Sequence, residues 1–163
     1  MSTTSSPDLL LDTHVWLWYS RGDRARLSTG VFGLLEQSGV SRGLVVSVVS
    51  LRELGILEVR GRLRFEIAFT AWVSEAIRRT RVRVASLEPD VSVLSTRLPG
   101  LVHRDPWDQL LIATALYYDW MLVTRDRAIL DYARAGHVRA VDAGSGRLVR
   151  EAARRPYRRK RGR

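Results

Sequence analysis

Five short apolar segments, each separated from the next by a stretch with helical spacing, constrain the fold of this chain most strongly. The segments span residues 8–12, 44–49, 81–85, 121–124 and 138–141. Apolar runs of this length, rich in leucine and valine, are typical of strands that are buried on both faces of a sheet. Because helical stretches separate them, we predict a mostly parallel sheet covered by helices on both faces.

The helical stretches carry start and stop signals. We expect helices over residues 13–20, 28–38, 50–60, 66–79, 88–96, 105–118 and 127–135. Ser50 and Glu53 form a capping-box pattern at the start of the third helix. Asp105 followed by Pro106 marks the strongest start, a capping side chain before a proline in the first helical position.

The basic charge is concentrated at one end. The chain has 163 residues and a formal net charge of +10, yet residues 1–146 hold 18 basic and 16 acidic residues. Residues 147–163 hold nine basic residues and one acidic residue. We therefore expect one domain over residues 1–146, followed by a basic arginine-rich tail over residues 147–163. Such a tail suits either contact with nucleic acid or an acidic partner, or a purely solubilising role.

Composition excludes several protein classes. The chain has no cysteine, which excludes a disulfide scaffold, a zinc finger and a thiol nucleophile. Its single lysine is Lys160, so neither a P-loop nor a Schiff-base lysine is present in the predicted domain. No apolar run approaches the length of a membrane-spanning helix, and the polar start has no basic segment typical of a signal peptide. We expect a cytoplasmic protein.

Four acidic residues stand near the carboxyl ends of predicted strands, where ligands bind in parallel sheets. Asp12 ends the first strand, Glu53 lies one helical turn past the second, Asp126 follows the 121–124 strand, and Asp108 lies in the first turn of the strong helix. Each has a structural alternative: Glu53 in the capping box, Asp108 near the helix dipole, and Asp126 as a helix cap. If the strands are neighbours, however, the carboxylates converge and must bind protons or a cation. Oxygen ligands favour Mg²⁺ or Mn²⁺, which can activate water and stabilise charge on a phosphodiester.

Four blocks of the sequence resemble those of PIN-domain ribonucleases, in particular the VapC toxins of type II toxin–antitoxin pairs. The blocks are Leu9-Leu10-Leu11-Asp12-Thr13-His14-Val15-Trp16-Leu17-Trp18, Ser47-Val48-Val49-Ser50-Leu51-Arg52-Glu53-Leu54-Gly55, His103-Arg104-Asp105-Pro106-Trp107-Asp108-Gln109-Leu110-Leu111-Ile112-Ala113-Thr114-Ala115 and Leu122-Val123-Thr124-Arg125-Asp126. They follow one another in the family order over roughly residues 8 to 143.

The resemblance implies a three-layer α/β/α sandwich with a sheet of four or five strands. It also implies a metal-dependent endoribonuclease that leaves a 5′-phosphate and a 3′-hydroxyl. Its acids fall on Asp12, Glu53, Asp108 and Asp126, which would bind Mg²⁺ or Mn²⁺ and carry catalysis. Thr124 would bond water or orient Asp126, and Asp105 would serve first as a cap and second in the outer shell of the site. The residues that bind the substrate do not follow from the resemblance.

The resemblance also implies partners: an RNA substrate, a cognate VapB-like antitoxin that covers the site, and a homodimer or a toxin–antitoxin hetero-oligomer. Trp16, Trp18 and Trp72 are candidates for partner surfaces, although large aromatic side chains are more often part of a core. Two other functions are compatible with parts of the sequence. One is a catalytically silent RNA-binding module that uses the basic tail, and the other is a flap-type DNA nuclease, which the short chain disfavours.

Overall fold

The structure of the chain, a computed structural model, describes residues 7–100 and 105–149. Most of the predicted basic tail, residues 150–163, lies outside the described residues. The elements in chain order are β1 (Leu9–Leu11), α1 (Thr13–Arg21), α2 (Thr29–Val40), β2 (Leu44–Ser47), α3 (Val48–Val59), α4 (Phe69–Thr80), β3 (Arg83–Ala85), α5 (Pro89–Ser95), α6 (Pro106–Tyr118), β4 (Met121–Thr124), α7 (Arg127–Arg134) and β5 (Ala140–Asp142).

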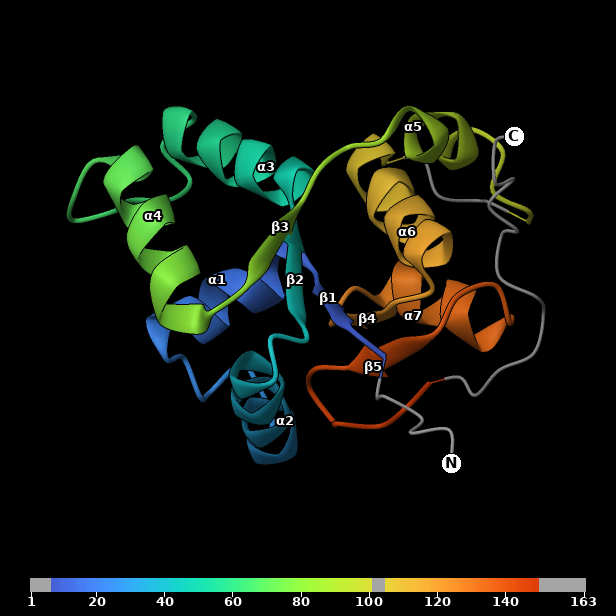
Figure 1. Ribbon diagram of the computed structural model, residues 1–163, viewed down its shortest axis with the longest axis horizontal. Helices are drawn as coiled ribbons and strands as arrows, with labels where there is room; N and C mark the ends of the chain where they lie inside the picture. The colour runs from blue at the N-terminus through green and yellow to red at the C-terminus, as the bar shows by residue number, and fades with distance from the viewer. Residues whose placement is uncertain (1–6, 101–104, 150–163) are drawn as a thin grey trace.

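The five strands form one parallel sheet in the order β3-β2-β1-β4-β5 (Figure 1). Leu11, at the end of β1, pairs with Val46 of β2 and with Val123 of β4. The chain first adds strands on one side of β1 and later on the other. The strand order therefore reverses between β1 and β4, the position at which open α/β sheets form a binding crevice.

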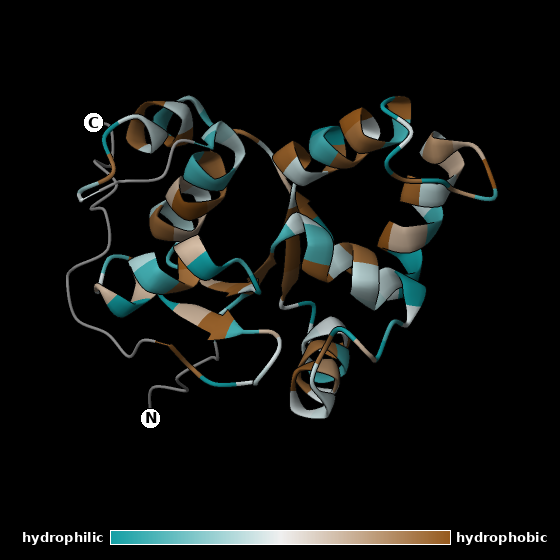
Figure 2. Cartoon of the chain, turned by 180° about the vertical axis from the view of Figure 1, so that it is seen from behind, coloured by the Kyte–Doolittle hydropathy of each residue, from teal (hydrophilic) through white to brown (hydrophobic). Residues whose placement is uncertain are grey.

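Helices cover both faces of the sheet, which confirms the predicted three-layer α/β fold. Side chains from alternate positions of a strand point to opposite faces. Accordingly, Leu9 and Leu11 pack with α1, α2, α3 and α4, whereas Leu10 packs with α5, α6 and α7. In Figure 2 the strands are mostly brown and the helices carry both brown and teal segments, as expected for helices with one apolar face.

Trp16 belongs to the core and is not part of a partner surface. Its side chain is fully buried, its ring centroid lies 5.5 Å from that of Trp72, and its Nε1 donates to Thr80 Oγ1 at 3.2 Å. The prediction that large aromatic side chains belong to the core is thus confirmed for this residue, while Trp18 and Trp72 are half-buried. Among the described residues, no helix has both the length and the apolar character needed to cross a bilayer.

The predicted start of the third helix is wrong. The second strand ends at Ser47 rather than at residue 49, and α3 begins directly at Val48. Ser47 Oγ accepts a hydrogen bond from the amide of Val49 at 3.1 Å and caps the helix. This cap and the packing around it override the strand preference of the two valines. Ser50 is therefore inside the helix, and the capping box that we predicted with Glu53 does not form.

Candidate active site

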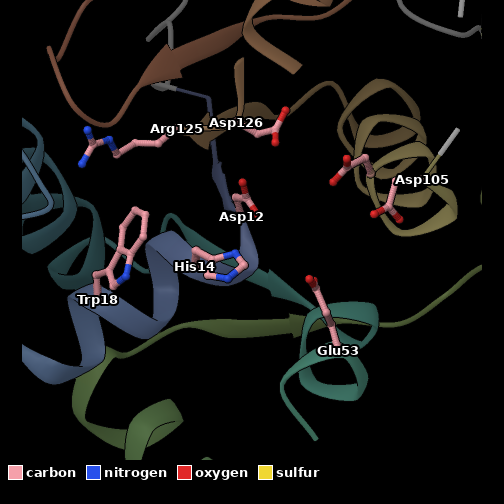
Figure 3. A pocket seen from close by; sticks show the side chains of 8 residues that line it. Asp12, His14, Trp18, Glu53, Asp105, Arg125 and Asp126 are labelled. Atoms are coloured by element: carbon pink, nitrogen blue, oxygen red, sulfur yellow. The ribbon is translucent and has the colours of Figure 1, made fainter. Parts of the chain in front are cut away.

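All four predicted carboxylates line one pocket of about 320 Å³ at the carboxyl ends of the strands, next to the reversal point (Figure 3). They come from four different elements or their ends: Asp12 from the end of β1, Glu53 from α3, Asp108 from α6 and Asp126 from the turn between β4 and α7. The remaining lining residues are His14, Trp18, Asp105 and Arg125. Residues distant in sequence are thus brought together by the strand order.

Asp12 is held by the neighbouring strands β1 and β4. Its amide donates to the carbonyl of Val123 at 3.0 Å, which continues the β1–β4 pairing by one residue. Its carboxylate is buried, and Oδ2 accepts a hydrogen bond of 2.5 Å from Thr124 Oγ1. The same Thr124 oxygen accepts the amide of Asp126 at 2.9 Å. Thr124 therefore connects Asp12 to the backbone of Asp126 and orients both.

Glu53 is oriented by a second threonine, which the sequence analysis missed. Thr13 Oγ1 donates to Glu53 Oε2 at 2.5 Å. Thr13 is completely buried at the start of α1, directly after Asp12. Because Glu53 lies in the second turn of α3 and bonds across to α1, the capping-box explanation for this residue no longer applies.

Asp105 and Asp108 lie at the start of α6. Asp105 is the predicted cap, since its Oδ1 accepts the amide of Trp107 at 2.9 Å. Asp108 is half-buried in the first turn. The Arg52 guanidinium lies 4.6 Å from the ring centroid of Trp107, so the residues next to Glu53 and Asp108 touch and join α3 to α6.

Asp126 caps α7, as predicted. Its Oδ1 accepts the amides of Ala128 at 2.8 Å and of Ile129 at 3.0 Å. These bonds fix the orientation of a carboxyl group that lines the pocket. The cap explains why an acid is tolerated here, but it does not explain why the carboxyl group also lines a pocket with four other acids.

The carboxylates perturb one another. Burial and the charges of Asp12, Asp105, Asp126 and Glu53 raise the pKa of Asp108 from 3.8 to about 8. Burial also raises the pKa of Asp12, and its bond from Thr124 opposes that shift only in part. The pocket thus favours bound protons or a cation over a full set of negative charges. Strongly shifted carboxyl groups in a cleft are typical of functional sites.

The other side of the pocket includes Trp18 and Arg125, which the sequence analysis did not assign to the site. Figure 3 shows Trp18 and Arg125 on the side away from Asp105, with His14 between Trp18 and Glu53. The available signal was that Trp18 lies in the same sequence block as Asp12 and that Arg125 directly precedes Asp126. Only the fold brings them together, because α1 and the β4–α7 turn are about a hundred positions apart.

The sequence pattern of the PIN domain matches residues 9–135, which is most of the chain. The chain belongs to the PIN-domain family. This PIN domain is 32% identical to the ribonuclease VapC22 of Mycobacterium tuberculosis over 121 residues, which cover 74% of this chain and 88% of that protein.

Solved structures with the same fold as this PIN domain include VapBC2 from Rickettsia felis bound to promoter DNA (TM-score 0.59, 14% identity, 81% of this chain and 96% of that chain). DNA-bound VapBC from Salmonella typhimurium is similar to the same degree (TM-score 0.60, 16% identity, 83% of this chain and 98% of that chain). FitAcB from Neisseria gonorrhoeae is also similar (TM-score 0.52, 16% identity, 74% of this chain and 88% of that chain). At these identities the likeness shows the fold alone.

Proposed function

We propose that the chain is a metal-dependent endoribonuclease and the toxin of a type II toxin–antitoxin pair. The observation that carries this proposal is the convergence of Asp12, Glu53, Asp108 and Asp126 on one pocket at the reversal point of the sheet. The identity to a VapC ribonuclease over most of both chains supports RNA as the substrate. Residues 1–146 would form the nuclease domain, and residues 147–163 a basic arm.

The donor set suits Mg²⁺ or Mn²⁺, because all four candidate ligands are carboxylates. In the described part of the chain, no three aspartate, glutamate or histidine side chains lie within ligating reach of one ion as they stand. Asp12, Glu53, Asp108 and Asp126 would hold such a cation in the pocket that they line. Burial and repulsion from the other acids together raise the pKa of Asp108 to about 8, and a cation would offset the repulsion. Bound there, it would supply Lewis acidity toward a phosphodiester and lower the pKa of water.

The residues of the chain itself would position these groups. Thr124 and Thr13 hold the carboxylates of Asp12 and Glu53 in one orientation, and the α7 amides hold that of Asp126. Asp108 would release its proton when the cation binds. Pre-set orientations of this kind reduce the reorganisation needed during catalysis.

The partners follow from the same proposal. A VapB-like antitoxin would cover the pocket, and the nuclease would form homodimers or hetero-oligomers with it. The relatives of known structure include VapBC complexes. Co-expression with the protein encoded next to this chain would yield a co-purifying complex without RNA cleavage. Independent purification of the two proteins, with full cleavage in their mixture, would contradict the antitoxin proposal.

The decisive test is cleavage of total cellular RNA by the purified, antitoxin-free chain, with Mg²⁺, Mn²⁺ or EDTA, and with new ends mapped by sequencing. We expect discrete cuts in Mg²⁺ or Mn²⁺ and none in EDTA. Asp12→Asn removes one charge at almost constant shape and should reduce cutting at least 100-fold. Asp131→Asn is the matched control, because Asp131 is exposed on α7 and pairs with Arg134.

Cutting in EDTA, or full activity of folded Asp12→Asn protein, would overturn the proposal. RNA binding with a steep salt dependence and no cutting in any metal would instead favour the silent RNA-binding module.

A further inference from the structure

The pocket has two chemically different sides. Its acidic side is formed by the carboxylates, and its other side by His14, Trp18 and Arg125 (Figure 3). We define the rim cluster as these three residues together with Arg26. Arg26 does not line the pocket itself but contacts the outer part of the cluster.

Trp18 is the centre of the rim cluster. Its indole ring is half-buried and belongs to the second turn of α1, one turn after His14. The Arg26 and Arg125 guanidinium carbons lie 5.4 Å and 5.9 Å from its ring centroid, and the His14 ring centroid lies 5.9 Å away. Trp18 thus presents a π-surface at the pocket beside positive charge, which distinguishes it from the buried Trp16.

Arg125 is held at the same rim. Its Nη1 donates to the carbonyl of Arg26 at 3.0 Å, so the guanidinium bridges the β4–α7 turn and the loop before α2. Among the described residues that line the pocket, Arg125 is the sole arginine, and five acids line the same pocket. A nucleic-acid strand that entered this pocket would place phosphates beside those acids. Arg125 is positioned to neutralise a phosphate next to the acidic side.

We propose that the rim cluster is a nucleotide subsite, in which Trp18 stacks on the base next to the scissile phosphodiester and Arg125 pairs with the phosphate of that nucleotide. This inference rests on the proposed function, since it takes single-stranded RNA as the ligand. Unpaired bases stack on aromatic side chains and arginine pairs with phosphates in single-strand recognition. The subsite would hold the strand in register with the carboxylates and favour bases that stack well.

Binding without cleavage tests the subsite. The probes are fluorescein-labelled 12-mers of single-stranded RNA, oligo(A) and a backbone of twelve abasic ribose phosphates, and the readout is fluorescence anisotropy of the full chain in Ca²⁺ and in EDTA. We expect Trp18→Ala to weaken oligo(A) binding about 5- to 100-fold and to leave binding of the abasic strand unchanged. Trp18→Phe retains a ring and should keep most of the preference for oligo(A).

Arg125→Gln should weaken binding of both strands about tenfold and reduce the slope of log K against log salt by about one. The matched controls come from the other end of the sheet, where Arg83 lies 5.9 Å from the ring centroid of Trp120 and also bonds a backbone carbonyl at 3.0 Å. Trp120→Ala and Arg83→Gln should bind both strands as wild type does. Thermal melting of each variant establishes that it is folded.

The stacking role would be overturned if folded Trp18→Ala protein bound oligo(A) with wild-type affinity. It would also be overturned if the variant lost equal affinity for oligo(A) and for the abasic strand. Failure of the wild-type chain to bind either strand would overturn the subsite altogether. These outcomes are separate from failure of the proposed function. If the wild-type chain cuts RNA in Mg²⁺ and the Trp18→Ala variant binds oligo(A) as wild type does, the subsite alone is refuted. Binding that depends on Trp18 without any cutting supports the subsite and refutes the nuclease.

Discussion

The Thr124 hydroxyl donates to Asp12 Oδ2 at 2.5 Å and joins the ends of β1 and β4 at the point where the strand order reverses. Both side chains are buried, and the two residues are 112 positions apart in the chain. The same hydroxyl oxygen accepts the amide of Asp126. One threonine thus determines how two of the four pocket acids are presented.

Removal of this hydroxyl should weaken the site without removing any carboxylate. Thr124→Val keeps the shape of the side chain but leaves the buried Asp12 carboxylate without its donor. Loss of an outer partner of this kind typically costs about 10- to 100-fold in metal affinity or activity. We expect a loss of that size in RNA cleavage and a higher Mn²⁺ concentration at half-maximal activity. Thr124→Ser should retain most activity.

The control for Thr124 is Thr114→Val, because Thr114 is buried in α6 and donates to the carbonyl of Leu110, away from the pocket acids. Equal losses in the two valine variants would mean that the effect of Thr124→Val comes from general destabilisation.

The cap and site roles of Asp126 should separate in two variants. Asparagine also caps helices well, so Asp126→Asn should keep the bonds to the α7 amides and almost all of the stability. Asp126→Ala removes the cap and should lower the free energy of unfolding by about 1 kcal/mol. Both variants should lose RNA cleavage. An active Asp126→Asn protein would show that capping is the whole role of the residue.

The raised pKa of Asp108 predicts how the stability of the metal-free protein depends on pH. Between pH values of about 4 and 8, the folded state holds a proton that the unfolded state has released. Stability should therefore fall as pH rises through this window and level off above it. Asp12, whose pKa is also raised, acts in the same direction. The measurement is the melting temperature in EDTA from pH 5.5 to 8.5.

A divalent cation should reverse this loss, because it favours the ionised carboxylates. We expect Mg²⁺ or Mn²⁺ to raise the melting temperature more at pH 8.5 than at pH 5.5. Asp108→Asn should flatten the pH dependence in EDTA. A wild-type melting temperature that rises or stays constant over this window would contradict the assignment.

Ser50 offers a stabilising substitution. Within the described residues, its Oγ is the one buried side-chain polar atom without a hydrogen-bond partner. Ser50→Ala removes an unsatisfied hydroxyl from a helix interior, where alanine is also preferred. We expect a gain of about 0.5 to 1.5 kcal/mol, measured as a higher urea midpoint with an unchanged slope.

Ser20→Ala serves as the comparison for Ser50, since Ser20 is equally buried but its Oγ donates to the carbonyl of Leu17 at 2.9 Å. It should show no such gain. A clear loss of stability in Ser50→Ala would mean that the hydroxyl has a partner in solution.

Local signals in the chain were sufficient for most elements. Asp105 and Asp126 were predicted as caps, and the structure confirms both, because a cap bonds to amides only two or three residues away. Leucine and valine runs predicted the strands for the same reason: burial on both faces requires a continuous apolar run. The start of α3 was misplaced by two residues, since Ser47 and Ser50 offer similar capping signals and packing chose the former.

For the candidate site, too, the sequence predicts the individual residues, whereas their contacts depend on the tertiary structure. The amino-acid sequence alone places an acid at or near the end of several predicted strands. Each of these acids can be predicted separately from its own local segment. Their meeting in one pocket depends on the order β3-β2-β1-β4-β5, which arises from long-range packing and is not encoded by any short segment. The bond from Thr13 to Glu53 and the contact of Arg125 with Trp18 join residues 40 and 107 positions apart. Such pairs form only when the sheet and its covering helices assemble, because nothing in their local sequence selects one distant partner over another.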